Sequence, residues 1–172
     1  GYFNTLRADD AITYHMIREG KKEKIKGKVV FKPLETNKYG DVVYNKVRFK
    51  DGYLRTILTK PHEVQGGKAP VVYLIPGYNC ASYDNMVPFH PYQRIVDSLT
   101  GLGYAVFKCE KSGMGDSYNT PNCFEINFHT EQEGFEAGYE HLLTYDFIDT
   151  SEIFSNLFMI FSLYIFDKML EN

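Results

Sequence analysis

A short apolar stretch near the middle of the chain, Val71–Ile75, limits the possible folds more than any other part of the sequence. It stops abruptly at Pro76-Gly77. A continuous apolar run of this length between turn residues is typical of a β-strand buried on both faces, in a sheet covered by helices. Ligands of open α/β sheets bind beyond the carboxyl ends of the strands, so the loop that begins at Pro76 is a candidate functional loop. The alternative is that Pro-Gly only turns the chain.

The pattern that follows this strand alternates between helix and strand. Pro91–Leu102 has apolar residues at helical spacing, Tyr104–Cys109 is a second short apolar strand, and Glu131–Tyr145 is a second amphipathic helix. A Gly- and Ser-rich loop covers Glu110–Pro121. Strand and helix in alternation at these lengths predict right-handed βαβ crossovers in a parallel sheet.

Two strand-like runs precede the apolar stretch, Val42–Phe49 and Tyr53–Lys60, joined by Lys50-Asp51-Gly52. Asp-Gly between alternating runs predicts a β-hairpin with a type I′ turn, because both central residues of that turn need positive φ. The polar segment Pro33–Gly40 is predicted to be a linker.

The first residues predict a separate small hairpin. Ala11–Arg18 alternates as a strand does, Glu19-Gly20-Lys21 makes a turn, and Ile25–Phe31 continues in extended form. Over about the first 34 residues the pattern resembles the C-terminal end of a PDZ domain. The peptide-binding parts of such a domain would lie earlier, so peptide binding is not implied. An ordinary N-terminal hairpin packed on the main sheet is the alternative.

Composition excludes several classes of function. Of the 172 residues 44% are hydrophobic and 24% are charged, which are values of globular proteins. The net charge of −3 indicates no binding to nucleic acid or an anionic membrane. The longest apolar stretch, Ile153–Phe166, is interrupted by polar residues and is shorter than the ~20 residues that a membrane span needs. The chain has no Cys-x-x-Cys pair and no phosphate-binding glycine motif, so no metal and no cofactor are predicted.

Three motifs in order resemble the first half of an α/β-hydrolase. The run Ile75-Pro76-Gly77-Tyr78 is similar to the oxyanion loop of that family, and Lys111–Ser117 is similar to the Gly-x-Gly-x-Ser turn after its fourth strand. Tyr145–Phe154 looks like the approach to the fifth strand. The resemblance spans residues 38 to 154 and is strongest to secreted serine esterases and peptidases with a PDZ segment in front. It implies an α/β fold, namely the N-terminal half of an α/β-hydrolase sheet with a leading antiparallel hairpin and then parallel βαβ units.

The resemblance also implies part of an active site. Acyl transfer develops negative charge on a carbonyl oxygen, and backbone N–H groups that already point at this oxygen stabilise it. In the family one such N–H follows the loop glycine, which makes Gly77 the loop residue and the Tyr78 backbone N–H the donor. Many relatives have His where this chain has Pro76, a tolerable change because the donor amide belongs to Tyr78. For a complete family member the substrate would be a small acyl ester or a peptide.

The rest of the catalytic machinery is not found in the sequence. The family's Gly-x-Ser-x-Gly elbow needs small residues around the nucleophile, but Ser162 lies between Ile160 and Tyr164. None of the five histidines follows a last strand, so we assign no nucleophile, acid or base. The chain is expected to be inactive as given, with residues 1–35 a PDZ-like remnant, 36–154 a partial hydrolase domain and 155–172 an atypical apolar tail. The alternative is a non-catalytic interaction protein that associates through its Phe-rich tail and exposed sheet edge.

The three cysteines provide information on the cellular compartment of the protein. In the hydrolase fold the loops after the strands ending at Ile75 and Cys109 lie side by side, and Cys80 and Cys123 stand one on each loop. The resemblance thus implies a Cys80–Cys123 disulfide, a free buried thiol at Cys109 and an extracytoplasmic location. Three unpaired thiols in a cytosolic protein are the alternative.

Overall fold

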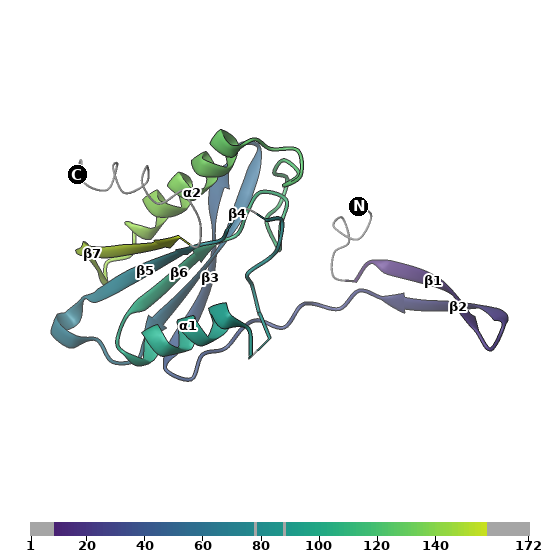
Figure 1. The fold of residues 1–172 in the computed structure, drawn as a ribbon, viewed down its shortest axis with the longest axis horizontal. Helices are drawn as coiled ribbons and strands as arrows, with labels where there is room; N and C mark the ends of the chain where they lie inside the picture. Colours follow the sequence, from purple (N-terminus) through teal and green to yellow (C-terminus); the bar gives the residue numbers. More distant parts are fainter. Residues whose placement is uncertain (1–8, 78, 88, 158–172) are drawn as a thin grey trace. The chain divides into compact units, whose positions relative to one another are not determined.

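A computed structural model describes residues 9–77, 79–87 and 89–157. The chain divides into two compact units, Gly1–Leu34 and Glu35–Asn172. Figure 1 shows the elements of both, and each unit is described by itself.

The first unit is an antiparallel hairpin of β1 (Ala11–Arg18) and β2 (Lys21–Lys28), in which Arg18 is paired with Lys21. Its two loop residues, Glu19 and Gly20, both have positive φ, 51° and 75°. This is the backbone that a tight two-residue hairpin requires. The second strand begins at Lys21, earlier than the predicted Ile25, because a two-residue loop lets pairing resume at once.

The second unit is a mixed five-stranded sheet with two helices. Its elements in chain order are β3 (Gly40–Phe49), β4 (Gly52–Pro61), η2 (Gln65–Gly67), β5 (Ala69–Ile75), α1 (Pro91–Gly101), β6 (Ala105–Cys109), α2 (Phe128–Leu142) and β7 (Ile148–Leu157). The strand order is β3-β4-β6-β5-β7. Strand β4 is antiparallel both to β3, with which it forms the hairpin, and to β6. Strand β5 is parallel to both β6 and β7. The predicted α/β architecture, with a leading hairpin and then parallel βαβ units, is confirmed.

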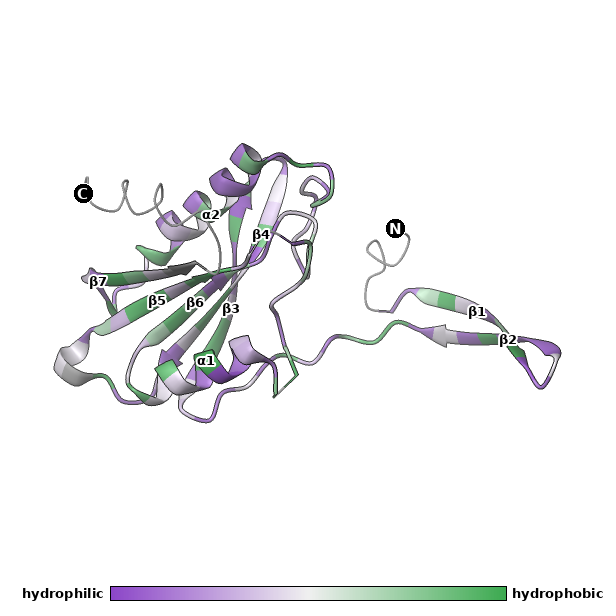
Figure 2. Ribbon diagram, viewed as in Figure 1, coloured by the Kyte–Doolittle hydropathy of each residue, from purple (hydrophilic) through white to green (hydrophobic). Residues whose placement is uncertain are grey.

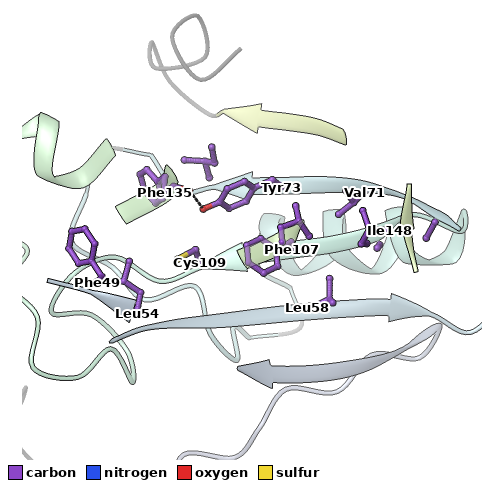
Figure 3. Packing of buried hydrophobic residues seen from close by; sticks show 13 residues of the cluster. Phe49, Leu54, Leu58, Val71, Tyr73, Phe107, Cys109, Phe135 and Ile148 are labelled. Atoms are coloured by element: carbon purple, nitrogen blue, oxygen red, sulfur yellow. Dashed lines mark hydrogen bonds between the residues drawn. The ribbon is translucent and has the colours of Figure 1, made fainter. Parts of the chain in front are cut away.

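The two helices cover opposite faces of the sheet (Figure 1). Alternate residues of β5 point to opposite faces, so Val72 and Leu74 pack toward α1, while Tyr73 lies in the larger cluster on the α2 side. In that cluster the rings of Tyr73 and Phe107 meet edge to face, and the Tyr73 hydroxyl donates to the backbone carbonyl of Phe135 in α2 (Figure 3). Figure 2 shows the resulting concentration of hydrophobic residues on the central strands β5 and β6.

Two local predictions need correction. The hairpin between β3 and β4 has Lys50 and Asp51 as its loop residues, and only Lys50 has positive φ, so the predicted type I′ turn at Asp51-Gly52 is wrong. The second helix begins at Phe128 and not at Glu131, because the Asn127 side chain accepts a hydrogen bond from the Thr130 N–H and caps the helix three residues earlier.

Candidate functional site

The loops after β5 and β6 leave the same edge of the sheet, because the two strands are parallel. A disulfide joins them, with Cys80 on the first loop, Cys123 on the second and a Cα–Cα distance of 5.8 Å. This is the pair expected from the sequence. Cys109 is a free buried thiol, and burial raises its pKa to about 12. It is therefore un-ionised at neutral pH and is not a nucleophile.

Gly77 lies in the first of these loops and is fixed through its backbone. Its carbonyl oxygen accepts hydrogen bonds from the Lys111 ammonium, at 2.7 Å, and from the Asn79 N–H, at 2.8 Å. A further hydrogen bond joins its backbone to the Tyr92 side chain of α1. A Cβ atom built on Gly77 would meet nothing within 4 Å. The backbone is thus held on one side, while the side-chain direction is open. Tyr78, the expected donor, lies outside the described residues.

Lys111 is the residue that sequence reasoning missed. Its side chain is only 1% exposed, and besides the Gly77 carbonyl it contacts the Glu131 carboxylate in the first turn of α2. One ammonium thus connects the loops after β5 and β6 with the start of a helix. No local pattern marks this role, since Lys111 is separated from Gly77 by 34 positions of the chain.

Glu110 forms a second link between the two loops. Its carboxylate accepts a hydrogen bond of 2.6 Å from the Tyr83 N–H. Burial raises the pKa of Glu110, against the lowering effect of its hydrogen bonds to Tyr83 and Ser82. Gly115, at φ 53°, passes so close that a Cβ there would lie 2.7 Å from a Glu110 oxygen. The glycine is therefore required by the backbone and by the carboxylate beside it.

Lys108 and Glu35 form a buried ion pair on the face of the sheet that α1 covers, since Lys108 alternates with Val106 in β6. The Lys108 ammonium lies 2.7 Å from both Glu35 carboxylate oxygens and 3.1 Å from the Tyr83 carbonyl oxygen. The Asn85 N–H donates to the same carboxylate at 3.0 Å. Tyr44 donates from its hydroxyl to Asp84 at 2.5 Å, so residues 83–85 are held by several charged or polar contacts.

The residues of the Gly-x-Gly-x-Ser turn have structural partners. Ser117 accepts a hydrogen bond from the Arg55 N–H, and Asp116 lies 3.5 Å from the Arg55 guanidinium. Ser112 donates to the Pro121 carbonyl at 2.6 Å. The two serines thus satisfy backbone groups, while Asp116 pairs with a side chain.

Within the described ranges no serine is hydrogen-bonded to a histidine. His90 caps α1 by accepting from the Tyr92 N–H, and His141 lies 3.3 Å from the Tyr145 hydroxyl. His62 and His129 face carboxylates, those of Asp41 and Glu133. Ser162 lies outside the residues that the structure describes. The described part of the site therefore consists of the loops after β5 and β6 and the buried charged side chains that contact them.

We also searched the described residues for a metal site, a membrane-spanning helix and cavities. No group of three metal-binding side chains occurs among the described residues, and no described helix is long and apolar enough to cross a membrane. A cavity of about 740 Å³ lies at the opposite edge of the sheet, where the parallel strands begin. Its lining includes Pro70 in β5, Tyr104 just before β6 and Asp149 in β7.

No model of a known protein family matches the sequence, and no curated protein matches it. Solved structures do match the fold. Acylaminoacyl peptidase from Pyrococcus horikoshii is 17% identical with a TM-score of 0.56, over 69% of this chain and 19% of the peptidase. A prolyl endopeptidase is 16% identical with a TM-score of 0.51, over 89% of this chain and 22% of the enzyme. A hypothetical protein from Pseudomonas aeruginosa is 16% identical with a TM-score of 0.53, over 72% and 36%.

These similarities show the fold. The chain has the α/β-hydrolase fold in part, and it spans between about a fifth and a third of the length of these solved structures. The resemblance inferred from the sequence is thereby confirmed for the hydrolase fold. No family model supports the PDZ resemblance of the first residues.

Proposed function

We propose that residues 35–157 are the oxyanion-side half of a serine hydrolase that acts on acyl bonds of peptides or esters. The observation that carries the proposal is the tethering of Gly77 by Lys111, Asn79 and Tyr92. An oxyanion donor is effective only if it is held in place before charge develops. The peptide bond after Gly77 carries the Tyr78 N–H, so fixing the Gly77 carbonyl also restricts the orientation of that donor.

The names of the similar structures favour a peptide substrate. Acylaminoacyl peptidase and prolyl endopeptidase are both peptidases. A peptide or an ester presents the same carbonyl carbon and oxygen to the site, so the proposal covers the acyl bond and not the leaving group.

The chain of 172 residues is proposed to lack turnover by itself. Ser162 is flanked by Ile160 and Tyr164, whose bulk opposes a strained elbow, and no glycine follows Gly138. We expect no labelling of this chain by a fluorophosphonate probe and no hydrolysis of a p-nitrophenyl ester. Turnover with labelling at one serine would contradict the proposed inactivity.

The coding DNA around Glu152 provides the test of the hydrolase proposal. An alternative frame encoding Gly-x-Ser-x-Gly there would explain the tail and supply the nucleophile, and its protein product should then hydrolyse p-nitrophenyl esters. In that product Tyr78→Pro, which removes the donor N–H, should lower kcat by about 10²–10³. The matched variant Tyr78→Phe keeps the N–H and should remain active. Absence of hydrolysis and labelling in the product would contradict the function, and equal loss in both variants would contradict the role of the amide.

A second candidate is a non-catalytic protein that associates with another copy or a partner. It is favoured by β7, a ten-residue strand at the end of the described sheet whose Phe154 is 49% exposed. Long edge strands with exposed apolar residues promote association. Sedimentation of the chain over a range of concentrations tests this, and Phe154→Lys should shift the protein toward monomer. A monomer at every concentration would contradict self-association.

An extracytoplasmic location is proposed from the Cys80–Cys123 disulfide, because such bonds persist in oxidising compartments. Titration of the unreduced, unfolded chain isolated from its natural compartment should find one thiol, that of Cys109. Three reactive thiols would contradict this location. We further propose that the β1–β2 hairpin is the end of a PDZ domain, which its tight turn and strand pairing support.

A further inference from the structure

The two units of the chain carry opposite charge. Residues 1–34 contain eight Lys and Arg against four Asp and Glu, a formal charge of +4. Since the whole chain has a net charge of −3, residues 35–172 carry −7. The small net charge of the whole chain is therefore the sum of a basic unit and an acidic one. The prediction from this net charge, that the chain does not bind polyanions, does not apply to the basic unit alone.

The basic residues of the hairpin are concentrated on one face. Alternate residues of a strand share a face, and the pairing of β1 with β2 places Lys22, Lys24, Lys26 and Lys28 on the same one. Their cross-strand partners are Ile17, His15, Thr13 and Ala11. No carboxylate occurs among these eight residues, and the only acid of β2, Glu23, is on the opposite face. We call the four lysines the lysine row, and Figure 2 shows hydrophilic residues along most of β2.

The opposite face of the ribbon has a different character. It presents Ile12, Tyr14 and Met16 from β1, with Ile25 paired to Tyr14. This face also carries Glu23 and the pair Arg18 and Lys21 beside the loop. Its charges are therefore mixed and next to apolar residues, whereas the charges of the lysine row all have one sign.

The lysine row has no neutralising partner among the residues that the structure describes. All four side chains are exposed, and none of them forms an ion pair or hydrogen bond with another described residue. Neighbouring like charges on a sheet face repel one another, so the row costs stability that folding alone does not require. Residues two apart in a strand are about 6.8 Å apart, and the four charges extend over about 20 Å. A small anion can contact only part of such a row, whereas an extended chain of negative charges can contact all of it.

We propose that the lysine row binds a linear anionic polysaccharide. The face of the lysine row has no Tyr, Phe or Trp within β1 and β2 on which nucleic-acid bases could stack, because Tyr14 lies on the other face, and His15 is its one ring. The disulfide of the second unit indicates an oxidising compartment, where polysaccharides and not nucleic acids are the ordinary polyanions. This proposal is independent of the proposed hydrolase function, since it rests on the charges of the first unit and on the disulfide, and on no catalytic residue.

The test measures binding of the full chain to size-defined heparin fragments, as a sulfated polysaccharide, at several salt concentrations. Affinity should fall steeply with salt, because ion contacts release counterions. Lys24→Gln should weaken binding roughly two- to fivefold and reduce the salt slope by about 1, as expected for one exposed ion contact. Lys21→Gln is the matched control, because it removes the same charge from the same strand but on the opposite face, and it should have little effect.

A second comparison keeps the result interpretable if the single effects are small. The triple variant K22Q/K24Q/K26Q should weaken binding at least about tenfold, whereas K38Q/K46Q/K68Q, with the same charge change in the second unit, should not. Equal losses in the two triple variants, or no heparin binding at low salt, would overturn the proposal. Tighter binding to single-stranded DNA or to anionic lipid vesicles than to heparin would overturn it as well. Lysines also discourage edge-to-edge pairing of strands, so aggregation of the row variants with unchanged heparin affinity would show that protection from pairing is their role.

Discussion

Buried charged side chains hold the candidate site together. Lys111 and Glu131 form one pair and Lys108 and Glu35 another, and all four side chains are at most 8% exposed. A buried ion is tolerated when it is paired and hydrogen-bonded, so each pair requires its loops to remain in place. The loop that carries Gly77 is ordered by such contacts, in addition to the disulfide.

Removing one partner of the Lys111–Glu131 pair should be strongly destabilising. Lys111→Met leaves the Glu131 carboxylate buried without its cation and should lower the free energy of unfolding by about 3–5 kcal/mol. The double variant Lys111→Met/Glu131→Met removes both charges and should recover most of this loss. Urea unfolding followed by circular dichroism measures both. A single variant as stable as the native protein would contradict the importance of the pair.

Glu110 should make stability depend on pH. Its pKa is raised by burial above the ordinary 4.5, so the folded protein holds the proton more tightly than the unfolded chain. This group's contribution to stability is therefore full below about pH 4.5 and is lost as pH rises through the raised pKa. Glu110→Gln keeps an acceptor for the Tyr83 N–H but cannot ionise.

The difference in unfolding free energy between Glu110→Gln and the native protein should then shift in favour of the variant as pH rises from 4 to 8. Urea unfolding at intervals of one pH unit measures it. Parallel curves for the two proteins would show that the carboxyl does not titrate in this way.

Several elements approach one another so closely that only glycine fits. The loop after β6 pairs with β4 through two hydrogen bonds between Tyr53 and Tyr118, at 2.8 and 2.9 Å. A Cβ on Gly52 would lie 1.9 Å from the Tyr118 carbonyl oxygen. Helix α2 likewise crosses the sheet at Gly138, where a Cβ would lie 2.5 Å from the Tyr73 hydroxyl. Both glycines are needed for close packing, and neither has positive φ.

Gly52→Ala should separate the loop from β4 and destabilise the protein by about 1–3 kcal/mol, the usual effect of overpacking. Gly77→Ala is the matched control, because its Cβ would meet nothing within 4 Å, and its effect should stay within about 0.5 kcal/mol. Thermal unfolding of both variants measures the difference. Equal effects would show that contact with the loop is not what requires Gly52.

The molecule as a whole combines a basic hairpin with a larger acidic unit of α/β-hydrolase fold. In the larger unit the disulfide joins positions 43 apart in the sequence and so connects the two loops of the candidate site. A cross-link of this length restricts the unfolded chain more than a short one does. It should therefore contribute to the stability of the whole unit as well as to the local order of the loops.

Cys80→Ser/Cys123→Ser should lower the free energy of unfolding by about 2–5 kcal/mol. Dithiothreitol should have a similar effect on the native protein and little effect on the double variant. Cys109→Ala serves as a control that leaves the response to reductant unchanged. A native protein insensitive to reduction in urea would contradict a stabilising disulfide.

Much of the fold was predictable because its signals are local. The apolar run Val71–Ile75, the helical spacing after Pro91 and the second apolar strand each depend on neighbouring residues, and all three appear as predicted in kind. Boundaries were less predictable. The start of α2 depends on which polar residue caps it, and the loop between β3 and β4 depends on the pairing register, so Asp51-Gly52 was misleading.

The candidate site likewise has features that the sequence predicts and contacts that only the tertiary structure reveals. By itself the sequence determined the buried strand, its abrupt end at Pro76-Gly77 and the α/β order of elements, because periodicity and turn residues act over a few positions. Only the tertiary structure decided that Lys111 meets both Gly77 and Glu131, and that Gly52 is required by the Tyr118 carbonyl. These contacts join residues far apart in the chain, and their strength comes from burial that no short stretch of sequence specifies.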